Sequence, residues 1–235
     1  MSDKGVGAVE RALSILDCFE EDHESLSLKE LAEKTGLYKS TILRLCISLE
    51  KYGYIRRCED GRYQLGATLW RLGALYRKRF DVAAHVRPLL KHLSDTTGES
   101  ASYYVRDGDA RICLMRQNSS QAIRHHLDEG TRLPLDKGAA GHLIRAYTDG
   151  SAERTDDIKQ NGFAMSLGER DPDTASIAVP VLGPGGQFLG ALVVSGLLSR
   201  FDEKARERAV TLAQDAAKKL SQDFGLGGFF SERCI

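Results

Sequence analysis

The spacing of apolar residues at the start of the chain predicts three short helices and a β-hairpin. Apolar residues recur at helical spacing over 6–19, 28–34 and about 40–51. Ser27 with Glu30 three residues later has the capping-box arrangement that begins a helix, and Gly36 suits a helix end because left-handed backbone costs glycine little. Two alternating segments, 54–58 and 62–65, flank an Asp-Gly turn signal. Together these elements predict a winged helix-turn-helix.

The rest of the chain predicts an α+β domain with a mainly antiparallel sheet. Helices are expected over about 68–80 and over 82–97, where Pro88 should kink or restart the second one. Residues 102–117 read as two strands around an Asp-Gly turn, and further strands are expected at 122–127, 176–182 and 188–195. Helices are expected over 138–150 and 202–224. We therefore predict a DNA-binding domain at 1–66, a linker helix at 67–81 and a second domain at 82–235.

Composition adds a local charge bias to this picture. The 235 residues contain 33 basic and 33 acidic side chains, so the whole chain carries no excess charge. Residues 34–66, however, hold seven basic and three acidic residues, and nucleic-acid binding depends on such a local patch. The five cysteines are scattered without a CxxC pair, and there is no signal-peptide pattern or apolar run of membrane-spanning length. We expect a cytoplasmic protein without membrane association, metal site or cofactor.

The outward face of the 40–51 helix is the predicted DNA contact. Hydroxyl groups at a helix start suit phosphate, and Arg44 suits the acceptors of guanine in the major groove. Leu43 fits either a thymine methyl group or the core beneath the wing. The residues expected to contact double-stranded operator DNA lie on this face, just before it or on the hairpin: Tyr38, Lys39, Ser40, Thr41, Leu43, Arg44, Ser48 and Arg62.

Two other classes of function remain as alternatives. Helix-turn-helix units also serve as protein-interaction modules, so a regulator acting through protein partners is the main alternative. A small-molecule enzyme is the second, with Cys113 and a histidine as a nucleophile pair. Cys113 lies in an apolar segment, and the chain has no nucleophile elbow or glycine-rich phosphate loop, so we predict that it is not an enzyme.

The chain resembles the IclR family of bacterial transcriptional regulators. The resemblance begins with VGAVERALSILDCF, SLKELAEKTGLYKSTILRLCISLEKYGYIRR and DGRYQLG. It continues through EGTRLPLDKGAAGHLIRAY, NGFAMSLGERDPDTASIAVPV and GALVVSG, and covers about residues 5 to 222. It implies a winged helix-turn-helix joined by a helix to a GAF-like effector-binding domain. It also implies dimers or dimers of dimers on paired half-sites, controlling a catabolic operon through a small-molecule effector.

The resemblance also implies where the effector binds. Its pocket would lie between the helix start near Gly138 and the sheet, lined by residues carried over from the family's motifs: Ala139, Ala140, Leu167, Ser176, Val193 and Ser195. Free amides at a helix start can hold an anion, although small residues there also permit close packing. Leu167 and Val193 stand where polar contacts are usual in the family. They suggest a less polar pocket for a carboxylate with an apolar or aromatic body. On the segment at 122–127, His125 and His126 would point to opposite faces, with one toward the pocket.

Overall fold

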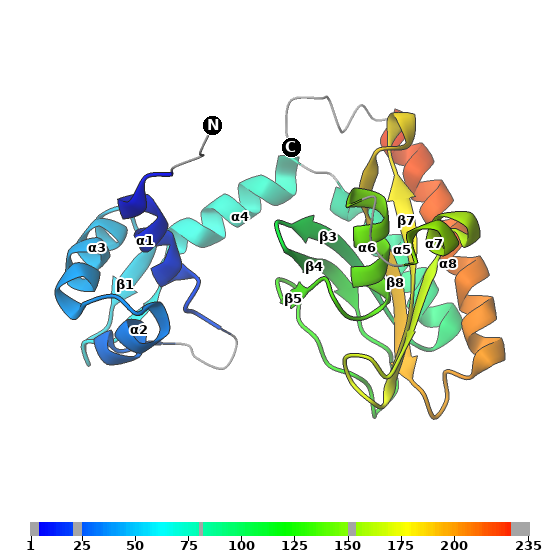
Figure 1. Ribbon diagram of the computed structural model, residues 1–235, viewed down its shortest axis with the longest axis horizontal. Coiled ribbons are helices and arrows are strands. Elements are labelled where there is room, and N and C mark those ends of the chain that lie inside the picture. The colour runs from blue at the N-terminus through cyan, green and yellow to red at the C-terminus, as the bar shows by residue number, and fades with distance from the viewer. Residues whose placement is uncertain (1–4, 21–24, 80–81, 150–153, 227–235) are drawn as a thin grey trace. The chain divides into compact units, whose positions relative to one another are not determined.

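The chain forms two compact units, Met1–Arg79 and Phe80–Ile235. The computed structural model describes residues 5–20, 25–79, 82–149 and 154–226. Figure 1 shows the helices and strands of each unit. Each unit has its own buried apolar cluster, so each is described by itself.

The first unit is a three-helix assembly with a two-stranded antiparallel wing. Its elements are α1 (Gly7–Leu16), α2 (Leu28–Thr35), α3 (Lys39–Lys51), β1 (Ile55–Arg57), β2 (Tyr63–Leu65) and α4 (Ala67–Arg79). Ile42, Cys46 and Leu49 of α3 are buried at helical spacing against the side chains of α1 and α2. Both the winged helix-turn-helix and this inward stripe are confirmed.

The local signals around α2 and α3 are mostly confirmed. The Ser27 hydroxyl accepts from the Glu30 amide at 3.2 Å, and the Glu30 carboxylate accepts from the Ser27 amide at 2.6 Å. Gly36 ends α2 with φ of 70°, a conformation that glycine adopts without a steric penalty. The start of α3 differs from the prediction, because the helix begins at Lys39 and Tyr38 is its N-cap without a side-chain bond. Ser40 is therefore an exposed residue of the first turn, and no capping role uses its hydroxyl.

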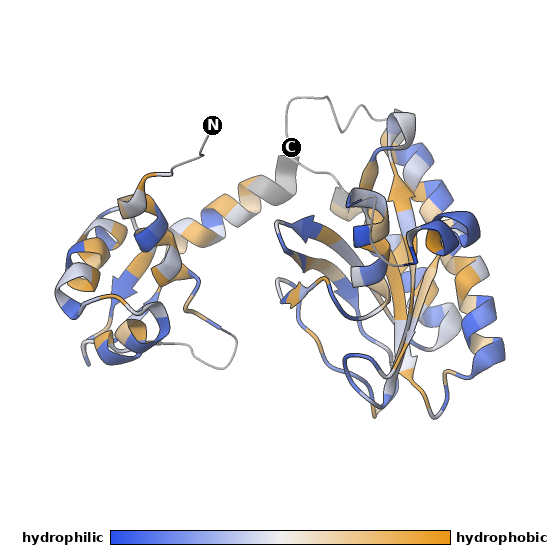
Figure 2. Ribbon diagram, viewed as in Figure 1, coloured by the Kyte–Doolittle hydropathy of each residue, from blue (hydrophilic) through white to orange (hydrophobic). Residues whose placement is uncertain are grey.

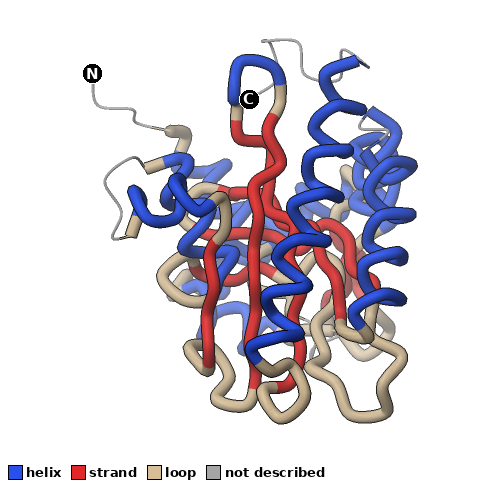
Figure 3. Tube along the Cα trace, turned by 90° about the vertical axis from the view of Figure 1, so that its right-hand side faces the viewer, coloured by secondary structure: helices blue, strands red, loops and turns tan. Residues whose placement is uncertain are grey.

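The second unit is a six-stranded antiparallel sheet with helices on both faces. Its helices are α5 (Val82–Thr97), α6 (Ala139–Thr148), α7 (Thr155–Asn161) and α8 (Glu203–Leu226). Its strands are β3 (Ser100–Asp107), β4 (Ala110–Gln117), β5 (Arg132–Pro134), β6 (Ala164–Leu167), β7 (Thr174–Leu182) and β8 (Phe188–Leu197), in the order β5-β4-β3-β8-β7-β6. The strands run alongside the packed helices in Figure 3.

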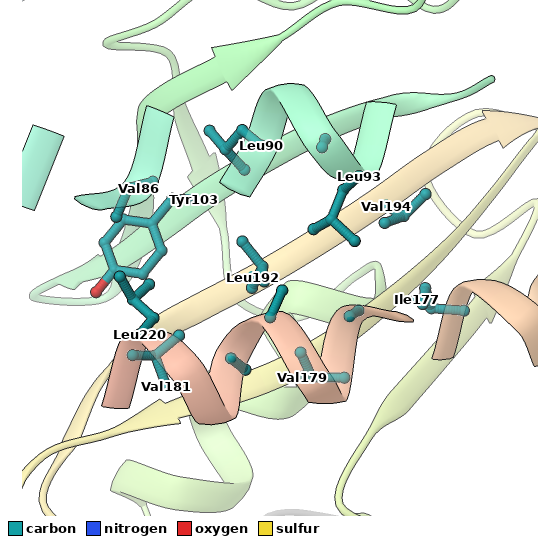
Figure 4. Close-up of a cluster of buried hydrophobic side chains, with 14 of the residues drawn as sticks. Val86, Leu90, Leu93, Tyr103, Ile177, Val179, Val181, Leu192, Val194 and Leu220 are labelled. Carbon is teal, nitrogen blue, oxygen red and sulfur yellow. The ribbon is translucent and has the colours of Figure 1, made fainter. Parts of the chain in front are cut away.

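Alternating residues along the central strands divide the core into two layers. Tyr103, Leu192 and Val194 face α5 and α8, where Figure 4 shows them converging with side chains of both helices. Their neighbours Tyr104 and Val193 point to the opposite face and pack with α6 and α7. Because both faces of β7 and β8 are covered, these strands are apolar along most of their length (Figure 2).

Several details of this unit differ from the sequence prediction. The segment 122–127 is irregular and not a strand, while Arg132–Pro134, which was not predicted as a strand, forms the edge strand β5 beside β4. Helix α5 continues through Pro88, so of the two predicted outcomes, a kink or a restart, the restart does not occur. The elements α7 and β6 were missed, since both are short and begin within a polar stretch. Asp202 caps α8 as expected, accepting from the Ala205 amide at 2.9 Å.

Candidate DNA-binding surface and effector pocket

The exposed face of helix α3 is mostly polar and includes a few apolar side chains. Lys39, Ser40, Arg44 and Ser48 are exposed along it, while Thr41 is half-buried. Three apolar side chains accompany them: Tyr38 is 85% exposed, Ile47 is 65% exposed and Leu43 is 39% exposed. None of the three belongs to the buried apolar cluster of the first unit. Leu43 therefore does not pack in the core beneath the wing, which was one of its two predicted roles. A cationic helix face with exposed methyl groups matches the donors and apolar contacts that read a major groove.

Arg62 has a different environment from the one predicted. Its Nη2 lies 2.9 Å from the Glu30 carboxylate and donates to the Ser25 carbonyl at 2.7 Å, and its Nε donates to the Ser25 hydroxyl. The hydrogen bonds from Ser27, together with this arginine, hold the pKa of Glu30 at about 2. Arg62 thus ties the wing to the start of α2, and its guanidinium is occupied within the fold.

Sequence reasoning missed two other wing arginines. Arg56 and Arg57 are both exposed on β1, and successive strand residues point to opposite faces. The guanidinium of Arg57 lies over the Tyr63 ring, 5.8 Å from its centroid, and Arg56 bonds to Gln64 across the hairpin. Their signal was the Arg-Arg pair two residues before the Asp-Gly turn, which places cations on the wing.

The second unit contains a polar cavity at the N-terminus of α6. It is bounded by β4, β6, β7, β8 and the segment between β6 and β7. Five of the six predicted effector residues line it: Ala139, Ala140, Ser176, Val193 and Ser195. Its volume is about 40 Å³, well below the roughly 300–1,000 Å³ of typical ligand pockets.

A row of serines forms the sheet side of this cavity. Ser166, Ser176 and Ser195 are cross-strand partners on β6, β7 and β8, so their side chains share one face. Ser166 was missed because its strand was missed. Val193 lies two residues before Ser195 on the same strand and supplies an apolar contact.

The prediction of a less polar pocket is wrong for this structure. Leu167 lies outside the cavity lining, because its side chain is 50% exposed at the end of β6. Arg111, Arg116 and Arg170 line the cavity instead. Arg111 and Arg116 come from β4, which no local pattern places beside α6, while Arg170 comes from the segment after β6.

The buried arginines are desolvated cations. Arg111 is 3% exposed, and burial lowers the pKa of the guanidinium groups of both Arg111 and Arg116. Arg116 donates to the Ser102 hydroxyl, the Asn118 side chain and the His125 carbonyl, all neutral acceptors. Arg111 donates to the Pro134 carbonyl, and its buried Nε has no partner among the described residues.

Glu169 is the acidic residue of the cavity. Its Oε2 accepts from the Gly138 amide at 2.9 Å and lies 2.6 Å from Nε2 of His142. Burial raises the pKa of Glu169, but the bonds from Gly138, His142 and Ser166 outweigh it and leave this pKa below its ordinary value. The carboxylate therefore binds the amide of Gly138, directly before the Ala139 and Ala140 amides that were predicted to hold an effector anion.

The two adjacent histidines are separated as expected, although not by strand geometry. His125 lines the cavity with Nε2 2.9 Å from Arg170, while His126 is exposed beside Asp128. Burial, together with the charges of Arg170 and Arg116, lowers the pKa of His125 to about 4. His125 is accordingly neutral near pH 7.

Catalytic and metal chemistry find little support in the described residues. Burial raises the pKa of the Cys113 thiol to about 11, so little of it is thiolate at neutral pH. Across residues 5–20, 25–79, 82–149 and 154–226, no three His, Cys, Asp or Glu side chains are grouped to hold a metal ion. No helix in the same ranges has both the length and the apolar character needed to cross a bilayer.

Known proteins resemble the chain over nearly its whole length. Residues 8–58 match the IclR helix-turn-helix domain, and residues 74–155 and 152–222 match the bacterial transcriptional regulator IclR C-terminal domain. The HTH-type transcriptional regulator KipR of Bacillus subtilis (strain 168) is 27% identical over 226 residues, which cover 86% of this chain and 90% of KipR.

Solved structures agree with this match. A putative IclR transcriptional regulator from Silicibacter sp. TM1040 has a TM-score of 0.84 at 25% identity, covering 93% of this chain and 96% of that one. An IclR homolog from Microbacterium hydrocarbonoxydans, complexed with 4-hydroxybenzoate, has a TM-score of 0.76 at 18% identity and covers 93% of this chain and 99% of that one. The chain belongs to the IclR family of DNA-binding bacterial transcriptional regulators, not to an enzyme family.

Proposed function

We propose that this regulator binds a twofold-symmetric operator through α3 and is controlled by a small organic anion bound at the N-terminus of α6. The effector role rests on Arg111, a buried residue of the cavity lining whose Nε has no hydrogen-bond partner among the described residues. A desolvated cation of this kind is costly unless an anion or acceptor compensates it. The 4-hydroxybenzoate held by the Microbacterium homolog supports an organic acid as the ligand class.

The DNA contacts are assigned by chemistry. Lys39 and Ser40 lie in the first turn of α3, where amides and hydroxyls suit phosphate, and Tyr38 lies directly before them. Arg44 and Ser48 follow one and two turns later on the exposed face and would meet base edges, with Leu43 against thymine methyl groups. Thr41 is half-buried and fits a backbone contact. On the wing, we assign the DNA contact to Arg56 and Arg57 and no longer to Arg62, because the Arg62 guanidinium is bound within the fold.

Homodimerisation is part of this proposal. Val9 and Leu13 of α1 are exposed, and so are Leu72 and Leu75 of α4. Apolar side chains at helical spacing on a solvent-facing surface indicate a protein contact. A second copy of the chain is the partner that fits, because a symmetric pair of winged helices would engage two half-sites and gain affinity through linkage.

Control of a catabolic operon follows from the same arrangement. An organic acid that relieves or imposes repression would connect its own presence with expression of the enzymes that break it down. The pocket supports a small acid as the signal, and the family resemblance supports a catabolic gene set as the target.

Selection of bound fragments from total genomic DNA tests this function. Purified protein is mixed with sheared DNA of the source genome, and bound fragments are sequenced at 50 and 200 mM salt. A few enriched sites with dyad symmetry are the expected result. Enrichment that does not depend on sequence at either salt would contradict it and would favour a regulator acting through protein partners.

A further inference from the structure

The effector cavity is too small, as it stands, for the ligand that its walls attract. At about 40 Å³ it has room for a few water molecules. An organic acid enters only if a lining group moves. Arg111 and Arg116 are buried on β4, whereas Glu169 and Arg170 are exposed residues between β6 and β7. The side chains best able to move are therefore Glu169 and Arg170.

Glu169 also holds the place that an effector carboxylate would take. A helix N-terminus attracts anions through its free amides and its dipole, and the carboxylate of Glu169 already accepts from the Gly138 amide. The second bond, from His142 in the first turn of α6, fixes it there. An incoming carboxylate therefore competes with Glu169 for the same donors.

The charge of the lining sets the number of anionic groups in the ligand. Arg111, Arg116 and Arg170 are positive, Glu169 is negative and His125 is neutral, which leaves an excess of two positive charges around the cavity. None of the three guanidinium groups forms an ion pair with a carboxylate among the residues that the structure describes. Asp136 influences Arg111 only at longer range.

Building on the proposed effector role, we infer that Glu169 is a built-in competitor that a dianionic ligand displaces. One anionic group of the ligand takes the Gly138 amide and its helix-start neighbours, and the other is held by Arg111 and Arg170. The Glu169 side chain turns out to solvent, which opens the cavity. Binding is thereby coupled to a rearrangement of residues 168–173 between β6 and β7.

Removing the negative charge of Glu169 tests this inference. Glu169→Gln keeps the shape of the side chain but weakens its hold on the amide, because charge-assisted hydrogen bonds are about twice as strong as neutral ones. Asp173→Asn is the matched control, since it removes the same charge from an exposed residue of the same segment that does not line the cavity. Calorimetry on the full chain measures the dissociation constants of sulfate and succinate as dianions and of chloride and butyrate as monoanions.

We expect succinate to bind more tightly than butyrate, and Glu169→Gln to bind succinate about tenfold more tightly than the Asp173→Asn control. Arg170→Gln should weaken the binding of both dianions about tenfold, and this exposed position avoids the folding risk of replacing Arg111. If succinate binds but Glu169→Gln does not differ from the control, displacement is refuted while the effector pocket stands. If neither dianion binds to any protein in the set, even at tens of millimolar, a dianionic ligand is refuted, and if butyrate does not bind either, the proposed effector role fails with it.

Discussion

Replacing Arg44 with alanine separates DNA recognition from folding. Arg44 lies on the exposed face of α3 and forms no hydrogen bond or ion pair with other described residues. Alanine is the best helix former, so Arg44→Ala should leave the melting temperature unchanged or slightly raised. A loss of operator affinity in Arg44→Ala would then come from the lost contact with DNA and not from unfolding.

The size of that loss follows from the number of contacts. A bidentate arginine–guanine pair contributes about 1–3 kcal/mol to discrimination. A dimer places one Arg44 in each half-site, so the variant should lose about 2–6 kcal/mol, or roughly 30-fold to 20,000-fold in affinity. Affinity for non-specific DNA should change far less, because that term comes mainly from phosphate contacts.

Fluorescence anisotropy with a labelled operator, at 50 and 200 mM salt, measures this effect. Lys51→Ala is the matched control, because it removes a cation at the far end of the same helix, where the ammonium lies 5.9 Å from the centroid of the Tyr52 ring. Lys39→Ala should weaken binding to all DNA sequences. It should also reduce the slope of log affinity against log salt concentration by about one released counterion per half-site. An Arg44→Ala protein that binds the operator within twofold of the wild type, with its sequence preference intact, would refute the assigned role of Arg44.

Three further predictions concern the first unit. Glu30→Gln should lower the melting temperature at pH 7 but not at pH 2. The pKa of Glu30 is about 2 in the folded protein, below its ordinary value of 4.5. The stabilisation by the Glu30 carboxylate is therefore present above pH 4.5 and is lost as the pH falls through 2. Circular dichroism at both pH values, with Glu33→Gln as control, checks this, and an equal loss at pH 2 would contradict it. Gly66→Ala should destabilise the unit by about 1–3 kcal/mol in urea unfolding, because the added Cβ would clash with the Gly53 carbonyl oxygen. An unchanged urea midpoint would show that the backbone of the wing shifts without cost. Leu13→Glu should shift the protein toward monomer in analytical ultracentrifugation, and an unaltered oligomer would exclude α1 from the dimer contact.

Local signals explain what the sequence predicted well. The capping box at Ser27 and Glu30, the turn at Gly36 and the Asp-Gly hairpin each depend on residues within a few positions of one another. The buried stripe of α3 is likewise a local pattern. These features require no knowledge of distant contacts, and the structure confirms all of them.

The charged residues of the cavity lining could not be predicted from local sequence patterns. The β3–β4 hairpin was predicted, but nothing within it indicates that Arg111 of β4 lies beside the start of α6. Leu167 and Glu169 lie only two residues apart, yet one is exposed outside the lining and the other bonds to the helix start. Counting residues along a motif selected the wrong one, because the turn after β6 decides which side chain faces inward.

The wing shows the same limit on a smaller scale. Arg62 and Arg57 are both cations of the hairpin, and composition does not distinguish them. The position of Glu30, fixed by its capping role, draws Arg62 inward and leaves Arg57 exposed. Arg62 is thereby held by Glu30 and Ser25, whereas the Arg57 guanidinium lies over the Tyr63 ring and Arg57 remains exposed.

One titration shows whether the cavity at α6 controls operator binding. Operator affinity is measured by anisotropy with and without a saturating dianion already shown by calorimetry to bind, for the wild type and for Arg170→Gln. If the two sites are coupled, the wild-type dissociation constant for the operator should change by about 5-fold to 150-fold, the usual range of such coupling, and that of the variant should change much less. If the wild-type protein binds both operator and dianion but each leaves the affinity for the other unchanged, the cavity does not regulate DNA binding and the account is wrong.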